Sequence, residues 1–231
     1  MGRSAIVTPA NGLVAGLLAG AIGVAALAGL GWPEGTEERA PELRESRAAA
    51  AAFLDAWRRS RRATWVVEAR FERVVGGRRT IILDMHMAQR PPDRVVVGPG
   101  AIDARRGGRR LACAAREDGD LTCRDGGPAP PYESEVDAEL DLLEGYVAAG
   151  GLYAVADEPG GCFRLRLRRV ILSPPYGQLA RFCFDPATGA PVRTEIERIE
   201  GRDRTVAVRV GARPTEEDLS PAGVRDGGGR G

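Results

Sequence analysis

Lysine is absent from this sequence of 231 residues, and all of its 33 basic residues are arginine, against 32 acidic residues. Arg3 is the only charged residue before Glu34, so the chain from Pro33 onward contains equal numbers of basic and acidic residues. Proteins that bind nucleic acid need a concentrated excess of basic side chains. The balance of charge therefore excludes nucleic acid as an expected partner.

Histidine is also scarce, since His86 is the only one. A single histidine excludes a histidine-rich metal site, and the sequence has neither a Gly-x-Ser-x-Gly motif nor a recognisable pair of catalytic Cys and His. We therefore expect no enzymatic activity, no metal site and no cofactor. His86 shares a strand face with Thr80 and Asp84, which predicts that it faces solvent.

Charge is missing altogether from residues 4–33, and the apolar residues 13–30 within them are long enough to approach a bilayer span. Arg3 precedes this segment and acidic residues follow it, so we expect the N-terminus inside and the next domain outside. The predicted location is the cell membrane, with one span and an extracytoplasmic C-terminal domain. Secretion is the alternative, because Ala26-Leu27-Ala28 before Gly29 fits cleavage of a signal peptide.

These features divide the chain into four segments. The predicted domains are residues 1–32 as a transmembrane anchor or signal peptide, 33–41 as a linker, 42–219 as the extracytoplasmic domain and 220–231 as a disordered tail. No cysteine precedes Cys113, which excludes an acyl anchor at the N-terminus.

The first half of the domain predicts a helix and then strands. Residues 42–62 place Phe53, Leu54 and Trp57 on one apolar stripe, and the arginines at the end of this helix are expected to be solvated. Further along the chain the apolar period changes to two, which is typical of strands with one buried face. The strands predicted here cover residues 65–71, 80–87, 94–97, 109–115 and 121–124.

The second half of the domain again predicts a helix followed by strands. Residues 133–149 predict a second helix, since apolar side chains recur there at helical spacing and Gly150-Gly151 follows. Tight turns at residues 185–189 and 200–203 predict a meander of antiparallel strands. The strands predicted here cover residues 152–156, 162–168, 179–184, 192–199 and 205–210.

The four cysteines predict two disulfides, because the domain is expected in a compartment that oxidises thiols. Cys113 and Cys123 flank Arg116-Glu-Asp-Gly-Asp120, and a three-residue hairpin loop with Gly119 in the left-handed position places them opposite one another. Cys162 and Cys183 both lie on the strand face opposite their phenylalanine neighbours, so the two can also pair. Spacings of ten and twenty-one residues do not fit a zinc site or a redox-active Cys-x-x-Cys pair.

Three segments of this chain resemble the LolA-like family, which includes lipoprotein carriers, LppX and LprG lipoproteins and RseB-type periplasmic sensors. They are the helix before Thr64-Trp-Val-Val-Glu-Ala-Arg-Phe, the segment Arg90-Pro-Pro-Asp-Arg-Val-Val, and Cys183-Phe-Asp-Pro-Ala-Thr-Gly-Ala-Pro-Val-Arg-Thr-Glu. The resemblance covers roughly residues 42–219. It implies an α+β fold in which a half-open antiparallel β-barrel encloses or packs against two main helices, with an apolar cavity for acyl chains.

The sequence is compatible with two functions. The first is a non-enzymatic domain that binds a lipid or another hydrophobic ligand in the apolar cavity. The second is a membrane-tethered sensor or interaction module that reports to a membrane protein partner and has no lipid ligand. The side chains expected to line the interior, or to form an ordinary packed core, are Trp65, Val67, Phe71, Ile81, Leu83, Met85, Met87, Phe163, Leu165 and Phe182.

Overall fold

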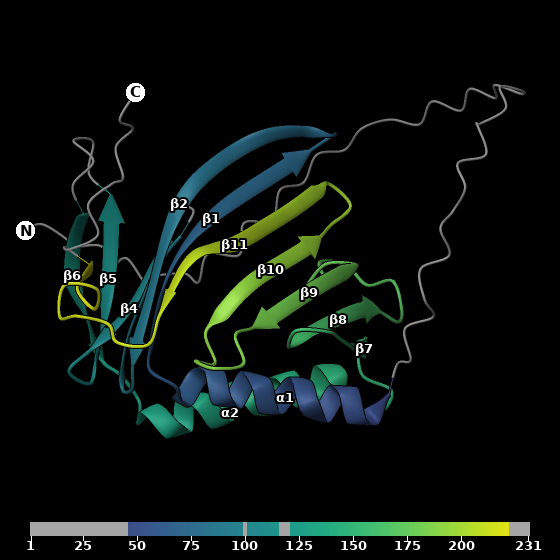
Figure 1. Ribbon diagram of the computed structural model, residues 1–231, viewed down its shortest axis with the longest axis horizontal. Coiled ribbons are helices and arrows are strands. Elements are labelled where there is room, and N and C mark those ends of the chain that lie inside the picture. Colours follow the sequence, from purple (N-terminus) through teal and green to yellow (C-terminus); the bar gives the residue numbers. More distant parts are fainter. Residues whose placement is uncertain (1–45, 99–100, 116–120, 222–231) are drawn as a thin grey trace, which may run out of the picture. The chain divides into compact units, whose positions relative to one another are not determined.

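The computed structural model describes residues 46–98, 101–115 and 121–221, which form two helices and one antiparallel sheet (Figure 1). Helix α1 (Arg47–Arg62) begins after Ser46, whose side-chain oxygen accepts a hydrogen bond from the backbone N–H of Ala49 at 3.0 Å. That bond satisfies one of the N–H groups that have no partner within the helix. Of the predicted apolar stripe, Phe53 is buried and Leu54 and Trp57 are partly buried against the same core.

Helix α2 (Tyr132–Val147) confirms the second predicted helix. Its buried side chains Val136, Leu140, Leu143 and Val147 recur at spacings of three and four, which places them along one side. Glu133 and Glu135 lie in the first turn, where the helix dipole favours negative charge. The helix therefore has an apolar side that faces the core and an acidic start.

The sheet has eleven strands within the described residues. They are β1 (Trp65–Val75), β2 (Arg78–Arg90), β3 (Asp93–Gly98), β4 (Ala101–Arg106), β5 (Arg109–Ala115), β6 (Leu121–Pro128), β7 (Tyr153–Glu158), β8 (Cys162–Leu167), β9 (Leu179–Phe184), β10 (Pro191–Glu197) and β11 (Gly201–Gly211). Their order across the sheet is β6-β5-β4-β3-β2-β1-β11-β10-β9-β8-β7, and the paired strands are antiparallel. Strands β6 and β7 are its two edges, so the sheet is open.

Strand β4 is the strand that the sequence did not predict. Its segment has no run of β-branched or aromatic residues, and Asp103 and Arg105 interrupt the apolar pattern. It forms because β3 and β5 pair with it on both sides. Backbone pairing across the sheet thus outweighs a weak local preference for strand.

Both helices pack against the same face of the sheet, which we call the inner face. Two groups of apolar side chains lie on it. The helix cluster consists of Ala49, Phe53, Ala56, Leu143, Val147, Tyr153, Val155, Phe163, Leu165, Ala180, Phe182 and Phe184. The strand cluster consists of Trp65, Val67, Ala69, Phe71, Met85, Met87 and Ala190.

Residues 212–221, which we call the C-terminal strap, lie on the opposite, outer face. Leu219 is fully buried there and packs with Val66 and Ala88. Nη1 of Arg106 donates a hydrogen bond to the backbone carbonyl of Leu219 at 2.9 Å. The strap therefore covers the outer face of β1 and β2. Residues 222–231, the rest of the predicted tail, lie outside the described residues.

Two disulfides join neighbouring strands. Cys113 and Cys123 are directly opposite one another in β5 and β6, and Cys162 and Cys183 are directly opposite in β8 and β9. Both pairs are the predicted ones: a hairpin predicted Cys113–Cys123, and strand alternation predicted Cys162–Cys183. The loop around Gly119 lies outside the described residues, as do the predicted membrane segment and linker. Among the helices that the structure describes, neither is long and apolar enough to cross a bilayer.

Candidate ligand-binding inner face

The side chains predicted to line the interior divide between the two clusters of the inner face. Phe163, Leu165 and Phe182 belong to the helix cluster. Trp65, Val67, Phe71, Met85 and Met87 belong to the strand cluster, and Ile81 packs against it while partly exposed. Leu83 is 40% exposed and is in neither cluster.

The helix cluster is closely packed. The ring of Phe53 from α1 contacts the ring of Phe163 at 5.6 Å between centroids, and the ring of Trp57 contacts that of Phe182 at 5.5 Å. Both pairs have the edge-to-face geometry that aromatic quadrupoles favour. These side chains act as an ordinary core between α1 and the sheet.

The strand cluster continues beyond the helices. Leu83, Met85 and Met87 alternate along β2 and pair with Phe71, Ala69 and Val67 of β1, so they share the inner face. In Figure 1 the ends of β1 and β2 near their connecting turn extend away from the helices. The inner face is consequently covered near Met87 and partly open at Leu83.

A small cavity of about 130 Å³ lies where α1, α2 and the sheet meet. Its apolar walls include Trp57, Trp65, Met87 and Phe182, and its polar walls include Arg61, Gln89, Arg94, Glu139 and Arg193. Met87 therefore belongs to this cavity as well as to the stripe that leads to Leu83. The cavity and the open part of the inner face lie along the same side of β2.

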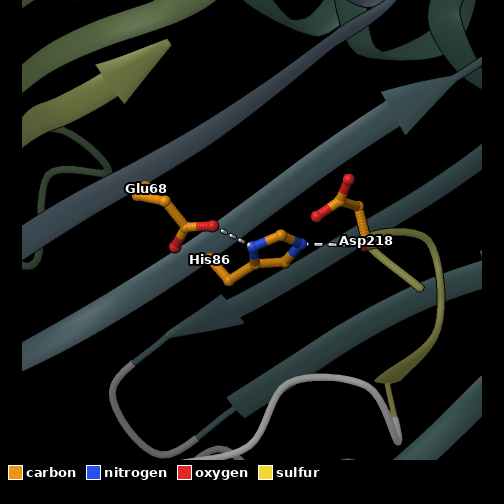
Figure 2. A group of neighbouring side chains, drawn as sticks. All are labelled: Glu68, His86 and Asp218. Carbon is orange, nitrogen blue, oxygen red and sulfur yellow. Dashed lines mark hydrogen bonds and ion pairs between the residues drawn. The ribbon is translucent and has the colours of Figure 1, made fainter. Parts of the chain in front are cut away.

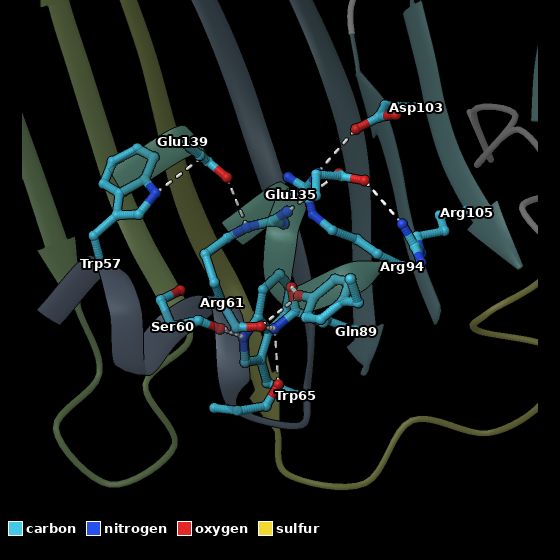
Figure 3. A network of polar contacts seen from close by, with 12 residues as sticks. Trp57, Ser60, Arg61, Trp65, Gln89, Arg94, Asp103, Arg105, Glu135 and Glu139 are labelled. Atoms are coloured by element: carbon cyan, nitrogen blue, oxygen red, sulfur yellow. Dashed lines mark hydrogen bonds and ion pairs between the residues drawn. The ribbon is translucent and has the colours of Figure 1, made fainter. Parts of the chain in front are cut away.

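A network of charged side chains surrounds this cavity (Figure 3). The side chain of Arg61 is only 7% exposed, and its Nε lies 2.9 Å from Oε2 of Glu139. The indole N–H of Trp57 donates to the other carboxylate oxygen of Glu139 at 2.9 Å. Nη1 of Arg105 donates to Glu135 at 2.9 Å. The network thus connects α1, α2 and β4.

Gln89 completes the end of α1. Its side-chain nitrogen lies within hydrogen-bond distance of the carbonyl oxygens of Ser60, Arg61 and Ala63, at 2.7, 2.9 and 2.8 Å. Helix ends leave such carbonyl groups without partners inside the helix. One fully buried amide therefore fixes the end of α1 against β2.

Three arginines, Arg61, Arg94 and Arg193, line the cavity together with one carboxylate, that of Glu139. Burial, followed by the nearby positive charge of Arg61, holds the pKa of the Arg94 guanidinium below its usual value. Asp103 opposes this effect, since its carboxylate lies 2.9 Å from Nη1 of Arg94. Nη1 of Arg61 is buried and has no hydrogen-bond partner within the described residues. An anion in the cavity would meet the guanidinium groups of Arg61 and Arg94 and also the carboxylate of Glu139.

The buried network was missed by the sequence analysis, which placed the arginines at the end of α1 in solvent. That expectation is wrong for Arg61, whereas Arg58 and Arg62 are about half exposed. A signal was present, because Phe53, Trp57 and Arg61 are four residues apart and so lie along one side of the helix. Gln89 likewise extends the inner-face alternation two residues beyond Met87.

His86 was expected to face solvent, and this is wrong. It lies on the outer face, as its alternation predicted, but the C-terminal strap covers it and leaves it buried. Its Nδ1 lies 2.9 Å from Oε1 of Glu68, and its Nε2 lies 2.8 Å from the backbone carbonyl oxygen of Asp218 (Figure 2). Both neighbours accept hydrogen bonds, so a protonated ring donates to both.

The side chains of Glu68, His86 and Asp218 also form a group whose potential metal-ligand atoms lie within 4.8 Å of one another. Both ring nitrogens of His86 already have oxygen partners. A metal ion would have to replace one of these bonds. The geometry therefore fits a clasp that holds the strap to β2.

Comparison with known proteins gives matches only among solved structures: no protein-family model matches the chain, and neither does any curated protein. The chain is similar to the MucA/MucB complex structure from Pseudomonas aeruginosa, with 14% identity and a TM-score of 0.44, over 75% of this chain and 60% of that one. It is also similar to LprF from Mycobacterium bovis, with 14% identity and a TM-score of 0.32, over 74% of this chain and 96% of that one.

A third similar structure is the LolA superfamily protein NE2245 from Nitrosomonas europaea, with 9% identity and a TM-score of 0.30, over 74% of this chain and 97% of that one. It carries the name of the family that the motifs of this sequence resemble. These identities and TM-scores describe a likeness of fold.

Proposed function

We propose that this chain is a non-enzymatic, extracytoplasmic domain that binds a hydrophobic ligand, such as a lipid or an acyl chain, on its inner face. The observation that carries the proposal is the apolar stripe along β2 that the helices leave partly open at Leu83 and Ile81. Apolar surface of this kind gains about 25 cal/mol per Å² when a ligand removes it from water. An apolar chain lying from Leu83 toward Met87 would bury this exposed stripe.

The cavity at the other end of this stripe suits the polar end of the same ligand. Arginines outnumber the one carboxylate in its lining, and Nη1 of Arg61 has no hydrogen-bond partner within the described residues, so an anionic group could accept a charge-assisted hydrogen bond there. The ligand class that fits both ends is an amphiphile with an apolar chain and a carboxylate or phosphate. Its chain would follow Met87, Met85 and Leu83 along β2.

A titration of the full chain with a fluorescent fatty acid tests the proposal. Leu83→Asp places a carboxylate on the inner face, where it would repel an apolar chain. Ile82→Asp is the matched control, because Ile82 is the next residue, is 51% exposed and lies on the outer face. We expect Leu83→Asp to weaken binding by about tenfold or more, which is about 1.4 kcal/mol. Equal affinities of the two variants would contradict the inner face as the site.

The second candidate is a membrane-tethered sensor or protein-interaction module without a lipid ligand. The observation that favours it is the size of the internal cavity, about 130 Å³. Pockets that enclose small ligands usually measure about 300–1,000 Å³. If the chain is such a module, the wild-type protein would not bind the fatty acid at all, and a membrane protein would be its partner.

The proposed location is outside the cytoplasmic membrane, with residues 13–30 as an anchor. The two disulfides support an oxidising compartment, since cytosolic thiols are normally kept reduced. Protease added to intact cells stripped of any outer envelope should digest the domain. Protection of the domain, while an established external protein is cut, would contradict this location.

A further inference from the structure

The most exposed apolar side chains of the described residues gather at one end of the sheet. Val170 and Leu172, in the loop between β8 and β9, are 90% and 97% exposed, and Ile199, in the turn between β10 and β11, is 86% exposed. The two segments line a hollow of about 380 Å³. Large apolar side chains that cluster on the surface in this way mark a surface that contacts something apolar.

The base of this loop is fixed to the fold. The hydroxyl of Tyr153 accepts a hydrogen bond from the N–H of Tyr176 at 2.9 Å and donates to the carbonyl of Gly177 at 3.2 Å. Gly177 has a φ of 63°, and a Cβ there would lie 2.1 Å from the carbonyl oxygen of Glu197. The loop therefore contacts the end of β10 through backbone that admits only glycine.

Positive charge flanks the apolar residues. Arg168 and Arg169 immediately precede Val170, both are exposed, and neither forms an ion pair within the described residues. Arg198 and Glu200, which line the hollow, offset one another in charge. The loop thus presents unpaired arginines next to apolar side chains. This combination suits the interface of a bilayer that contains anionic lipid.

The chain also enters the domain at this end. The backbone N–H of Ser46, the first described residue, donates to the carbonyl of Val155 in β7 at 3.2 Å. Val155 is two residues from Tyr153, which holds the base of the loop. In Figure 1 the start of α1, the β8–β9 loop and the β10–β11 turn lie toward the right of the sheet. The described chain therefore begins at the same end of the sheet as the exposed apolar side chains.

We propose that this end of the domain docks on an anionic lipid bilayer, with Val170, Leu172 and Ile199 inserted among the lipids and Arg168 and Arg169 at the phosphate groups. Each arginine near an anionic surface contributes about 1 kcal/mol, which is about fivefold in the docking equilibrium. This surface is separate from the inner-face site. The proposal holds whether or not that site binds a ligand.

Quenching by brominated lipid tests the docking in the full chain. The protein is reconstituted into vesicles of phosphatidylcholine and phosphatidylglycerol, with ordinary or brominated acyl chains. Leu172→Trp reports on the loop after subtraction of the wild-type signal, and Leu142→Trp is the control. Leu142 is an exposed residue of α2, 56% exposed. We expect brominated lipid to quench the tryptophan at position 172 strongly and the one at position 142 weakly.

The arginines are tested by adding Arg168→Gln and Arg169→Gln to Leu172→Trp. The docking equilibrium should fall about 25-fold, since each arginine is worth about fivefold, and quenching should fall with it. Replacing phosphatidylglycerol by phosphatidylcholine should have a similar effect. Quenching at position 172 no greater than at position 142 would overturn the proposal, and a protein would then be the partner of this loop.

Discussion

Replacing Arg61 should destabilise the domain far more than replacing its neighbour Arg62. Both side chains connect α1 to acidic residues of α2, but Arg61 is 7% exposed and Arg62 is 46% exposed. Arg61→Ala removes a buried guanidinium and leaves the carboxylate of Glu139, which is 34% exposed, without this ionic partner. Breaking a fully buried pair costs about 3–5 kcal/mol, and the partial exposure of Glu139 reduces the expected cost to about 2–3 kcal/mol. Arg61 also lies over the ring of Tyr132, 5.5 Å from its centre, and this contact is lost as well.

Arg62→Ala removes ion pairs to Glu133 and Asp137, whose side chains are exposed. Exposed pairs are worth about 0–1 kcal/mol, because water and salt screen them. In a domain of this size, a change of 1 kcal/mol shifts the melting temperature by about 2–4 °C. Arg61→Ala should therefore lower the melting temperature by about 4–12 °C, and Arg62→Ala by less than about 4 °C.

Urea unfolding, followed by circular dichroism, measures both variants against the wild type. Similar losses of unfolding free energy in the two variants would refute the reasoning, because burial would then not distinguish the two arginines. A loss below 1 kcal/mol for Arg61→Ala would refute it too.

Three more predictions concern the disulfides, acid stability and the strap. Replacing Cys162 and Cys183 by Ala should cost about 3 kcal/mol, as expected for opening a loop of this length, and thermal unfolding should show it. A hydrogen bond from the Thr188 hydroxyl is the main cause of the lowered pKa of Asp185, so Thr188→Val should destabilise the fold at neutral pH. That difference should shrink in urea unfolding as the pH falls below about 4, and it should be lost as the pH falls through the lowered pKa of Asp185, where the folded-state carboxylate becomes protonated. His86→Phe should speed amide hydrogen exchange in residues 215–221, whereas unchanged exchange would contradict the clasp.

Helix stripes and strand alternation predicted most of the fold, because the inner face buries apolar side chains at the regular spacings of α1, α2 and the strands. The same alternation predicted the pair Cys162–Cys183, and a hairpin predicted Cys113–Cys123. Strand β4 did not, since it depends on backbone pairing with both neighbours and not on its own composition. The openness of the sheet was implied by the family resemblance and not by any spacing.

The candidate site was predicted only in part. Alternation identified Leu83, Met85 and Met87 as residues of one face, but it did not reveal which of them the helices cover. The positions of Arg61 and His86 depend on segments distant in sequence, namely α2 and the C-terminal strap. From sequence alone, a charged or titratable residue is predicted to be exposed unless its buried partner is known.

The most direct test of the central claim is native mass spectrometry of the full chain extracted gently from its host membranes. A lipid bound to the inner face should be released as a defined extra mass that gentle activation removes. The account predicts an amphiphile with an anionic end, present in the wild type and in Ile82→Asp and depleted in Leu83→Asp. Repeated absence of any bound lipid from the wild-type protein would contradict the claim.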